Sequence, residues 1–343
     1  MSSFWCNLKL NQVAYFALIF VLVFFGVFSY DLADYSNYEL IYKLSAAESG
    51  KGAELVEPGF LLLCKLFNII GVPFPVFRGL YILTAICFLL KGLKFFNKVD
   101  SNVPLLLYIV FPFALDVVQY RFFLASAIVI YSIKYLEERK FLKYIVAVLF
   151  AATQQYAAVF YLLFLIVSLD KEKVAKIVFF MTIIELVLLP IIMELVFSRM
   201  GFLFMHYSDY SDSAYSRTLC VLYLFMTFAI VLFDYFGIKN NDSFDEFMQK
   251  ILYLSVLLVP FIFLNENFSR LYRGVLLLIY CRLFQKTNDK RNVCAISVFA
   301  IVFCGFMFYF HLSPHNQTHW NRVMMPIFEN NFIFDFFKDG LLW

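Results

Sequence analysis

The chain has 343 residues, of which 63% are hydrophobic and only 15% are charged, and its formal net charge is +3. Soluble domains contain roughly 45–50% apolar and about 25% charged residues, so this chain has too little polar surface to cover a soluble globule. A net charge this small, spread along the whole chain, also argues against a basic surface for nucleic acid. The composition therefore predicts a protein that is embedded in lipid.

A membrane-spanning helix needs about 20 apolar residues, and the loops on the cytoplasmic side are enriched in Lys and Arg. Together these rules predict an all-α polytopic membrane protein with about eleven transmembrane helices, its N-terminus inside and its C-terminus outside. No linker or repeat divides the chain, so we expect residues 1–343 to form a single multi-span membrane domain. The predicted spans cover residues 13–29, 74–90, 103–115, 122–136, two short helices within 142–169, 177–197, 218–236, 251–264, 271–283 and 293–310, and an interfacial helix is expected in the tail from 311 to 343.

Two segments depart from the simple pattern. Residues 59–70 are apolar but too short to cross, which is typical of a re-entrant or interfacial segment. Residues 142–169 are too long for one helix and too short for two full ones, with Thr153, Gln154 and Gln155 at the middle and basic residues at both flanks. Two short helices that meet at the polar triplet bring both basic flanks to the same side, so we predict a hairpin.

Several ionisable residues remain at the outer ends of the predicted spans. A charge at the membrane edge is costly and by default marks a functional site. The alternative is that such residues extend to lipid headgroups or form structural ion pairs. These residues are Asp34, Glu57, Arg78, Arg121, Arg217, Glu266, Arg270, Arg273 and Arg322.

Arg270 and Arg273 are three residues apart, which places both guanidinium groups on one helix face near the outer boundary. Two such groups suit a phosphate or pyrophosphate, because each can donate two charge-assisted hydrogen bonds. Glu266 lies one turn earlier and is expected to hold Arg270. Arg121 lies in the short polar loop between two predicted spans, residues 116–121, where a charged side chain needs a group of opposite charge.

Glu57 precedes Pro58 and Gly59, at the point where a polar loop turns into the short apolar segment. A carboxylate fixed at this entrance could act as a general base or orient a sugar hydroxyl. It could equally cap the N-terminus of the re-entrant helix, since Pro is favoured at the next position. The sequence leaves both roles open.

The sequence favours neither a metal nor another cofactor. His311, His315 and His319 recur at every fourth residue, the spacing of metal ligands on a helix. Pro314 would interrupt that helix, and no carboxylate accompanies the histidines in a recognised pattern. The motifs of nucleotide-driven pumps, redox cofactors and hydrolase triads are also missing, so we predict no cofactor and no metal.

Several of these segments, in this order, resemble the EpsG-like proteins, which belong with the Wzy-type polysaccharide repeat-unit polymerases of bacteria. The similarity extends over residues 31–168 and continues in the topology and the outer arginines. It is carried by Asp34-Tyr35 with Tyr38 and Tyr42, by Glu57-Pro58-Gly59-Phe60, by Gln119-Tyr120-Arg121 and the helix after it, and by Glu138-Arg139-Lys140.

This sequence departs from the family pattern at two places. Gln154 and Gln155 stand in the middle of the hairpin, where the family usually has His, and Phe122 replaces the usual Gln after Arg121. Glutamine donates and accepts hydrogen bonds but does not titrate near neutral pH. If the family histidine were the proton acceptor, this protein would need another one.

The resemblance implies a GT-C-like membrane glycosyltransferase in the bacterial cytoplasmic membrane, with its active site facing outward. Such an enzyme joins repeat units carried on undecaprenyl pyrophosphate into O-antigen, capsule or exopolysaccharide. The growing chain would be the donor and the non-reducing sugar of an incoming unit the acceptor. Its partners would be lipid-linked glycans and membrane lipids, with the flippase and chain-length regulator of the same pathway as candidates.

Under this hypothesis, the ionisable residues at the outer ends of the spans bind the substrate or take part in the reaction. A leaving pyrophosphate needs cations at the membrane surface, and an acceptor hydroxyl needs a proton acceptor, for which Glu57 and Asp34 are the candidates. A lipid-linked oligosaccharide transporter or a surface-glycan ligase is the alternative, although a transporter favours midplane charges and repeated halves, which the sequence lacks. The predicted pyrophosphate-binding residues are Arg270, Arg273, Arg121 and Arg217, and the predicted sugar-binding residues are Tyr35, Gln154 and Gln155.

Overall fold

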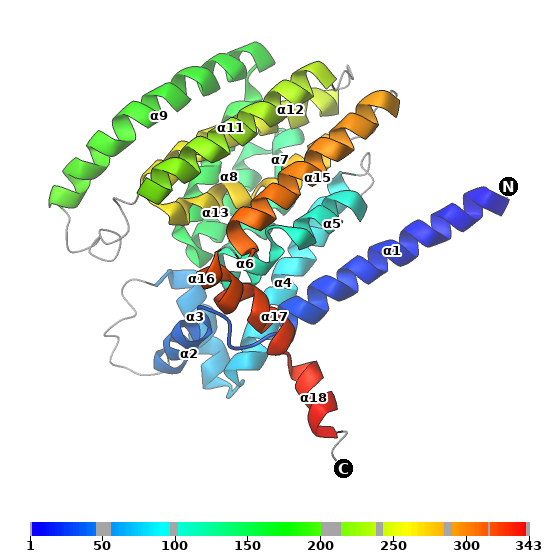
Figure 1. Cartoon of the computed structure of the whole chain (residues 1–343). Helices are drawn as coiled ribbons and strands as arrows, with labels where there is room; N and C mark the ends of the chain where they lie inside the picture. Colours follow the sequence, from blue (N-terminus) through cyan, green and yellow to red (C-terminus); the bar gives the residue numbers. More distant parts are fainter. Residues whose placement is uncertain are drawn as a thin grey trace.

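The computed structural model describes residues 2–45, 56–96, 102–199, 214–237, 243–284, 290–314 and 316–340. Within these ranges the secondary structure is helical, apart from an isolated antiparallel bridge between Ser29 and Asn331. The all-α prediction is therefore confirmed for the part of the chain that the structure describes (Figure 1).

The elements of the N-terminal half are α1 (Ser2–Val27), α2 (Tyr35–Leu44), α3 (Pro58–Ile69), α4 (Phe74–Phe95), α5 (Asn102–Val110), α6 (Phe113–Val118), α7 (Tyr120–Glu137), α8 (Phe141–Gln154) and the 3-10 helix η1 (Tyr156–Ser168). Helix α7 packs closely on both α4 and α8, whereas α1 extends away from the other helices toward its N-terminus, and α2 and α3 lie at one end (Figure 1).

The C-terminal half packs against these helices and contains more short helices. Its elements are α9 (Lys171–Arg199), α11 (Ala214–Gly237), α12 (Ser243–Ser255), η2 (Val256–Leu258), η3 (Pro260–Phe263), η4 (Glu266–Phe268), α13 (Ser269–Arg273), α14 (Leu276–Leu283), α15 (Lys290–Leu312), α16 (Gln317–His319), η5 (Trp320–Met324), α17 (Met325–Glu329) and α18 (Phe332–Gly340).

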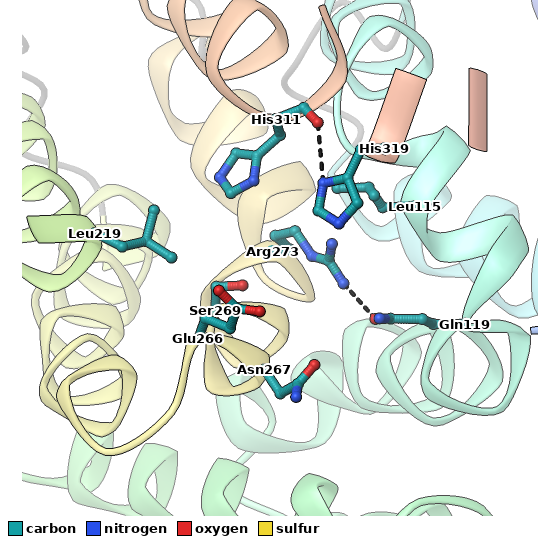
Figure 2. A pocket seen from close by; sticks show the side chains of 9 residues that line it. All are labelled: Leu115, Gln119, Leu219, Glu266, Asn267, Ser269, Arg273, His311 and His319. Atoms are coloured by element: carbon teal, nitrogen blue, oxygen red, sulfur yellow. Dashed lines mark hydrogen bonds between the residues drawn. The ribbon is translucent and has the colours of Figure 1, made fainter. Parts of the chain in front are cut away.

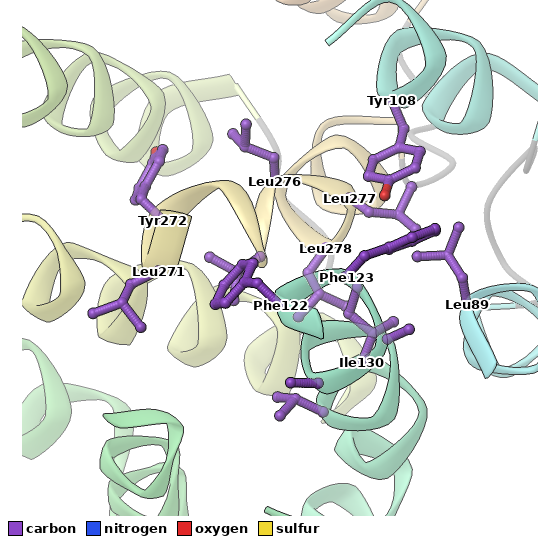
Figure 3. Packing of buried hydrophobic residues seen from close by; sticks show 14 of the residues in the cluster. Leu89, Tyr108, Phe122, Phe123, Ile130, Leu271, Tyr272, Leu276, Leu277 and Leu278 are labelled. Atoms are coloured by element: carbon purple, nitrogen blue, oxygen red, sulfur yellow. The ribbon is translucent and has the colours of Figure 1, made fainter. Parts of the chain in front are cut away.

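Helix α7 is the core of the fold, since almost its whole circumference is buried. A helix that is apolar all round is buried in a protein core or in a membrane, and α7 is surrounded by α4, α8, η1 and α6. Gly92 on α4 allows close contact, because a Cβ atom there would lie 2.8 Å from Ile130 Cγ2. Figure 3 shows side chains of α7 packing against those of α13, α14, α5 and α4, among them Phe122, Phe123, Ile130, Leu271, Tyr272, Leu276, Leu277, Leu278, Tyr108 and Leu89.

The outer faces of the peripheral helices are also apolar. Phe179 on α9 and Phe225 on α11 are 62% and 68% exposed. Large exposed apolar surfaces of this kind are typical of contact with lipid. Three helical stretches among the described residues, Phe74–Phe95, Ser216–Tyr235 and Ser243–Phe263, are long and apolar enough to cross a membrane. Each overlaps a predicted span, although the third begins at Ser243, eight residues before the predicted start at residue 251. The total of about eleven spans and the GT-C-like architecture are not confirmed.

Two predicted spans are interrupted in the structure. The span predicted over 103–115 consists of α5 and α6, which are separated at Phe111 and Pro112, because Pro has no N–H to continue the helical hydrogen bonds. The span predicted over 271–283 consists of α13 and α14, which are separated at Gly274 and Val275. Both interruptions bring loop residues to the same end of the bundle, where the outer arginines lie.

The hairpin prediction is confirmed. Helix α8 ends at Gln154, Gln155 has an extended backbone with φ −155° and ψ 114°, and η1 begins at Tyr156. The hydroxyl of Tyr144 donates to the carbonyl of Tyr161 at 2.7 Å, so η1 folds back along α8. The re-entrant segment predicted over 59–70 is the short helix α3, which packs beside the tip of this hairpin.

The ends of the bundle differ in charge. At one end, Phe95 at the end of α4 contacts Phe244 at the start of α12, with ring centroids 5.7 Å apart. Lys250 on α12 acts electrostatically on Asp170, which precedes α9, so the basic helix ends predicted for the inside lie together. The short elements α2, α3, α6, α13 and α16 gather at the opposite end (Figure 1).

The tail crosses this opposite end. Helix α18 is attached to the end of α1, because Tyr30 stacks on Phe332 and donates to Asp335 Oδ2 at 2.7 Å. Phe336 and Phe337 are 73% and 59% exposed. The interfacial helix expected in the tail stays a prediction, and α18 is the segment that fits it.

A buried ion cluster stabilises the C-terminal half. Arg282 on α14 is 1% exposed and bridges Asp234 on α11, at 2.5 Å from Nε to Oδ1, and Asp245 on α12. Gln249 donates to the second oxygen of Asp234 at 2.6 Å. Three helices are therefore held together by one guanidinium group.

We expect Arg282→Leu to destabilise the protein by about 3–5 kcal/mol, because it leaves two carboxylates buried without their cation. The measurement is the midpoint of thermal unfolding in detergent. Replacing Arg282, Asp234 and Asp245 together by Leu should cost less than the single change, since no charge then stays buried. A single variant as stable as the parent protein would contradict this role.

Candidate functional site

The end of the bundle opposite the basic helix ends carries most of the predicted site residues. They form two adjoining groups. The first, which we call the arginine edge, consists of Asp34, Glu57, Arg121 and Arg270. The second is a hollow of about 410 Å³ of empty space, including the space at its mouth, lined by Leu115, Gln119, Leu219, Glu266, Asn267, Ser269, Arg273, His311 and His319 (Figure 2).

Glu57 and Arg121 form a direct ion pair at the arginine edge. Glu57 is 4% exposed, and its other carboxylate oxygen accepts a hydrogen bond from the backbone N–H of Tyr156 at 3.3 Å. The guanidinium of Arg121 also lies over the rings of Tyr38 and Phe60, at 5.0 and 5.2 Å from their centroids. Carboxylate and aromatic faces together hold the cation in one orientation.

The local sequence explains how Glu57 reaches Arg121. Pro58 is the first residue of α3, so Glu57 occupies the capping position, yet its side chain makes no capping hydrogen bond. Gly59 permits the tip of the hairpin to approach, because a Cβ atom there would overlap the side chains of Thr153 and Gln154. Of the two roles that the sequence left open for Glu57, the structure does not show capping, and it shows a contact with Arg121 instead. The role toward a sugar hydroxyl stays a prediction.

Asp34 lies in the electrostatic field of two arginines. It precedes α2 without capping it. Burial raises the pKa of Asp34, and the charges of Arg270 and Arg121 act in the opposite direction. The arginine edge thus combines two guanidinium groups from α7 and α13 with the carboxylates of the residues that precede α2 and α3.

Arg270 and Arg273 have different partners, although both lie on the five-residue helix α13. Arg270 donates from Nε to the carbonyl of Asn267 at 2.7 Å and from Nη2 to Asn267 Oδ1 at 2.9 Å. We expected Glu266 to hold Arg270, and the structure assigns that contact to Asn267. Arg273 instead lines the hollow, where its guanidinium meets the side chain of Gln119 (Figure 2).

Arg273 is the buried cation of the hollow. It is 4% exposed, donates from Nη2 to Gln119 Oε1 at 2.5 Å, and its Nε is buried without a hydrogen-bond partner. The charge of Arg273 acts electrostatically on Asp116 of α6. The carboxylate of Asp116, however, accepts a hydrogen bond from the hydroxyl of Tyr108. Among the described residues, no carboxylate lies within ion-pair distance of Arg273. A buried guanidinium without such a partner is unfavourable unless a ligand supplies the negative charge.

Two histidines line the hollow beside Arg273. His311, at the end of α15, is stacked on Phe111 with centroids 5.4 Å apart, and its Nε2 lies 2.9 Å from the hydroxyl of Tyr223. His319 on α16 has its Nδ1 3.1 Å from the carbonyl oxygen of His311 (Figure 2). Because α15 ends at Leu312, His311 and His319 do not share one helix, and His315 lies outside the described residues.

The remaining predicted residues lie around these two groups. Gln154 is 1% exposed and accepts a hydrogen bond from Tyr81 at 2.9 Å, so it stabilises the hairpin from inside, whereas Gln155 is partly exposed at the tip. Arg217 is exposed at 5.8 Å from the ring of Phe263. Tyr35 packs edge-on against Phe74.

Two other arginines of the outer set have different surroundings. Arg78 is buried and donates to the carbonyl and hydroxyl of Ser29, which makes it a structural residue. Arg322 on η5 is exposed. The side chains of Tyr207, Tyr210 and Tyr215, which the sequence offers for stacking on sugars or for the membrane interface, lie outside the described residues.

Sequence reasoning missed the polar residues that complete the hollow. Gln119 and Ser269 are uncharged, and no pattern distinguishes them from other polar residues near span ends. A signal did exist for Gln119, since it belongs to the same polar loop as Arg121. The assembled hollow offers a guanidinium, amides, a hydroxyl, a carboxylate and imidazoles, which can bind an anion beside sugar hydroxyl groups.

Gly274, directly after Arg273, keeps α13 close to the core. A Cβ atom there would collide with the hydroxyl of Tyr161 and lie 3.0 Å from Phe122 Cζ and Ser126 Cβ. Tyr161 cannot move freely, because its hydroxyl donates to the carbonyl of Leu271 at 2.8 Å.

We therefore expect Gly274→Ala to cost about 1–3 kcal/mol, as overpacking does, measured as a lower thermal midpoint. Gly305→Ala on α15 is the matched control, because nothing lies within 4 Å of the position of its Cβ atom. Equal midpoints for the two variants would contradict the close packing of α13.

Comparison with known proteins gives one finding. A family model described as the EpsG family matches residues 12–324, a range that contains every residue of the arginine edge and the hollow. The curated proteins and the solved structures contain no match to the chain.

Proposed function

This chain belongs to the EpsG family of polysaccharide-polymerase-like membrane proteins, and from that membership we propose that it is a membrane glycosyltransferase. It polymerises undecaprenyl-pyrophosphate-linked oligosaccharide repeat units into a surface polysaccharide such as O-antigen, capsule or exopolysaccharide. The reaction forms a glycosidic bond to the acceptor sugar and releases the lipid pyrophosphate of the donor.

The observation that supports this proposal best is Arg273. Its guanidinium is buried, lines an open hollow and has no carboxylate in ion-pair contact among the described residues. A phosphate or pyrophosphate supplies the missing charge, and its oxygens accept charge-assisted hydrogen bonds from a guanidinium. We therefore assign the leaving pyrophosphate to the side of the hollow that Arg273 occupies.

The arginine edge acts on the same group. Negative charge develops on the pyrophosphate as its bond to the sugar breaks, and cations that are already oriented stabilise this charge without reorganisation. Arg121, held by Glu57, and Arg270, held by Asn267, are oriented in this way. Arg217 is exposed beside Phe263 and is assigned to phosphates that enter from the membrane surface.

The two carboxylates receive different roles. Glu57 is bound to Arg121 and to a backbone N–H, so it is a positioning residue for the cation. Asp34 is partly exposed among Arg121 and Arg270, and we assign it to a hydrogen bond that orients a sugar hydroxyl. Tyr35 and Gln155 are assigned to sugar contacts at the entrance, and Gln154 supports them by fixing the hairpin.

The charge distribution supports an orientation in the bacterial cytoplasmic membrane. The basic helix ends belong inside by the positive-inside rule, which puts the arginine edge and the hollow at the outer face of a multi-pass protein. Lipid-linked repeat units are the proposed substrates there. The flippase that delivers them and a chain-length regulator are proposed partners.

Arg273→Gln should lower the rate of chain elongation about 10²–10³-fold, as the loss of one preorganised donor does. Arg270→Ala should abolish long chains while leaving membrane insertion intact. The measurement is the ladder of products that purified protein forms from lipid-linked repeat units, with Arg139→Gln at the basic end as the matched control.

Normal-length polymer from Arg273→Gln or Arg270→Ala would rule out these roles. If the wild-type protein moved repeat units across vesicle membranes without forming any glycosidic bond, it would be a transporter and not a polymerase.

A further inference from the structure

The proposed reaction needs a group that takes the proton of the attacking hydroxyl. Glu57 is a poor choice, because its carboxylate is bound to Arg121 and to the N–H of Tyr156. An opposite charge in direct contact stabilises the ionised form of a carboxylate and so weakens it as a base. Gln154, at the middle of the hairpin, does not titrate near neutral pH. The hollow, however, contains the imidazole of His319, which makes no ion pair with an arginine among the described residues and can titrate near neutral pH.

The hydrogen bonds of His319 determine which ring nitrogen carries the proton. Its Nδ1 lies 3.1 Å from the carbonyl oxygen of His311, and a carbonyl can only accept. Nδ1 therefore carries the hydrogen, and in the neutral ring Nε2 keeps its lone pair. The amide nitrogen of Asn316, 3.3 Å from Nδ1, is itself a donor and so makes no hydrogen bond to a protonated Nδ1, whereas Asn316 Oδ1 accepts from the backbone N–H of His319 at 3.3 Å. The carbonyl of His311 therefore orients the ring at this edge.

The free edge of the ring faces the hollow. Figure 2 shows the hydrogen bond to His311 leaving from one edge of His319, while the opposite edge points toward the side where Arg273 and Gln119 meet. An acceptor nitrogen is thus presented next to the cation that we assign to the pyrophosphate. This is the arrangement that a hydroxyl attacking a pyrophosphate-bound sugar carbon requires.

We propose that His319 accepts the proton of the acceptor hydroxyl, with Nε2 as the base and the carbonyl of His311 as the group that orients the ring. The inference rests on the proposed function. The hydroxyl oxygen forms a bond to C1 of the donor sugar, and the bond from C1 to the pyrophosphate oxygen breaks. Its electron pair leaves with the lipid pyrophosphate, and the hydroxyl proton moves to Nε2. The imidazolium then returns this proton to water.

The surroundings keep the ring neutral before reaction. Burial lowers the pKa of His319 below its ordinary value of 6.5, Arg273 acts in the same direction, and the carbonyl of His311 opposes them. The titratable and charged groups that line the hollow with it are Arg273 on α13, His311 on α15 and Glu266 on η4. Of the elements packed nearby, η5 carries Arg322 and α6 carries Asp116. The base is therefore available at neutral pH and is lost only as the pH falls through this lowered pKa, which lies below 6.5.

The test uses two substitutions of His319 in the full-length protein. Asn places an amide N–H where Nδ1 lies, so His319→Asn can keep the bond to the carbonyl of His311 while removing Nε2. His319→Gln offers an oxygen near the position of Nε2 that accepts a hydrogen bond but does not take the proton. Glu266→Gln tests the rival base, because Glu266 is the carboxylate that lines the same hollow.

The measured quantity is the single-turnover rate of glycosidic bond formation from pH 5 to pH 9, with equal amounts of monodisperse protein. The probes are a short prenyl-pyrophosphoryl repeat unit as donor and a second unit as acceptor. We expect the wild-type rate to fall below pH 6.5. Both His319 variants should be about 10²–10⁴-fold slower at neutral pH and should lose this acidic limb, whereas Glu266→Gln should retain it. The dissociation constant of the donor should differ less than threefold between each His319 variant and the wild type.

Three results would overturn the role of His319. They are a rate for His319→Asn within threefold of wild type, a slow His319→Asn that keeps the acidic limb, and an acidic limb that disappears only in Glu266→Gln. A wild-type protein that forms no product overturns the polymerase function, and with it this role. An active wild type with an unaffected His319→Asn overturns the role of His319 alone.

Discussion

A guanidinium group inside a lipid-embedded bundle has to be neutralised by the protein or by a ligand, because neither lipid nor apolar side chains can solvate it. Arg282 is neutralised by Asp234 and Asp245, and Arg121 by Glu57. Arg273 differs, since its direct partner is the amide of Gln119 and it lines an open hollow. This contrast separates two arginines that are neutralised by carboxylates from Arg273, to which the proposed function assigns a ligand anion.

The site exists because helices are interrupted at one end of the bundle. The backbone N–H and C=O groups of a continuous helix bond to one another, and its side chains project from its flanks. Non-helical backbone is tolerated at membrane depth only where protein or water surrounds it. The breaks between α5 and α6 and between α13 and α14, and the hairpin between α8 and η1, all lie at this end. They bring residues from distant parts of the chain to one place, as the contact of Tyr156 with Glu57 shows.

Several features were predictable because they depend on local patterns. The hairpin followed from basic residues on both flanks of residues 142–169, and the short helix α3 followed from the length of its apolar run. The pairing of Glu57 with Arg121 was not predictable, because capping was an equally good use of the carboxylate. Nor could the spacing of Arg270 and Arg273 show that they have different partners, since α13 is only five residues long and ends at Gly274.

The sequence by itself determined that this is a helical membrane protein of the EpsG type, with charged residues concentrated at one edge, because hydropathy, the position of basic residues and ordered motifs are all properties of the chain. Only the tertiary structure decided which of those charges neutralise one another and which face the hollow, because that depends on contacts between residues far apart in sequence. His319 illustrates the difference. In the sequence it completes a histidine repeat suggestive of metal ligands, whereas in the fold the carbonyl of His311 orients its ring beside Arg273.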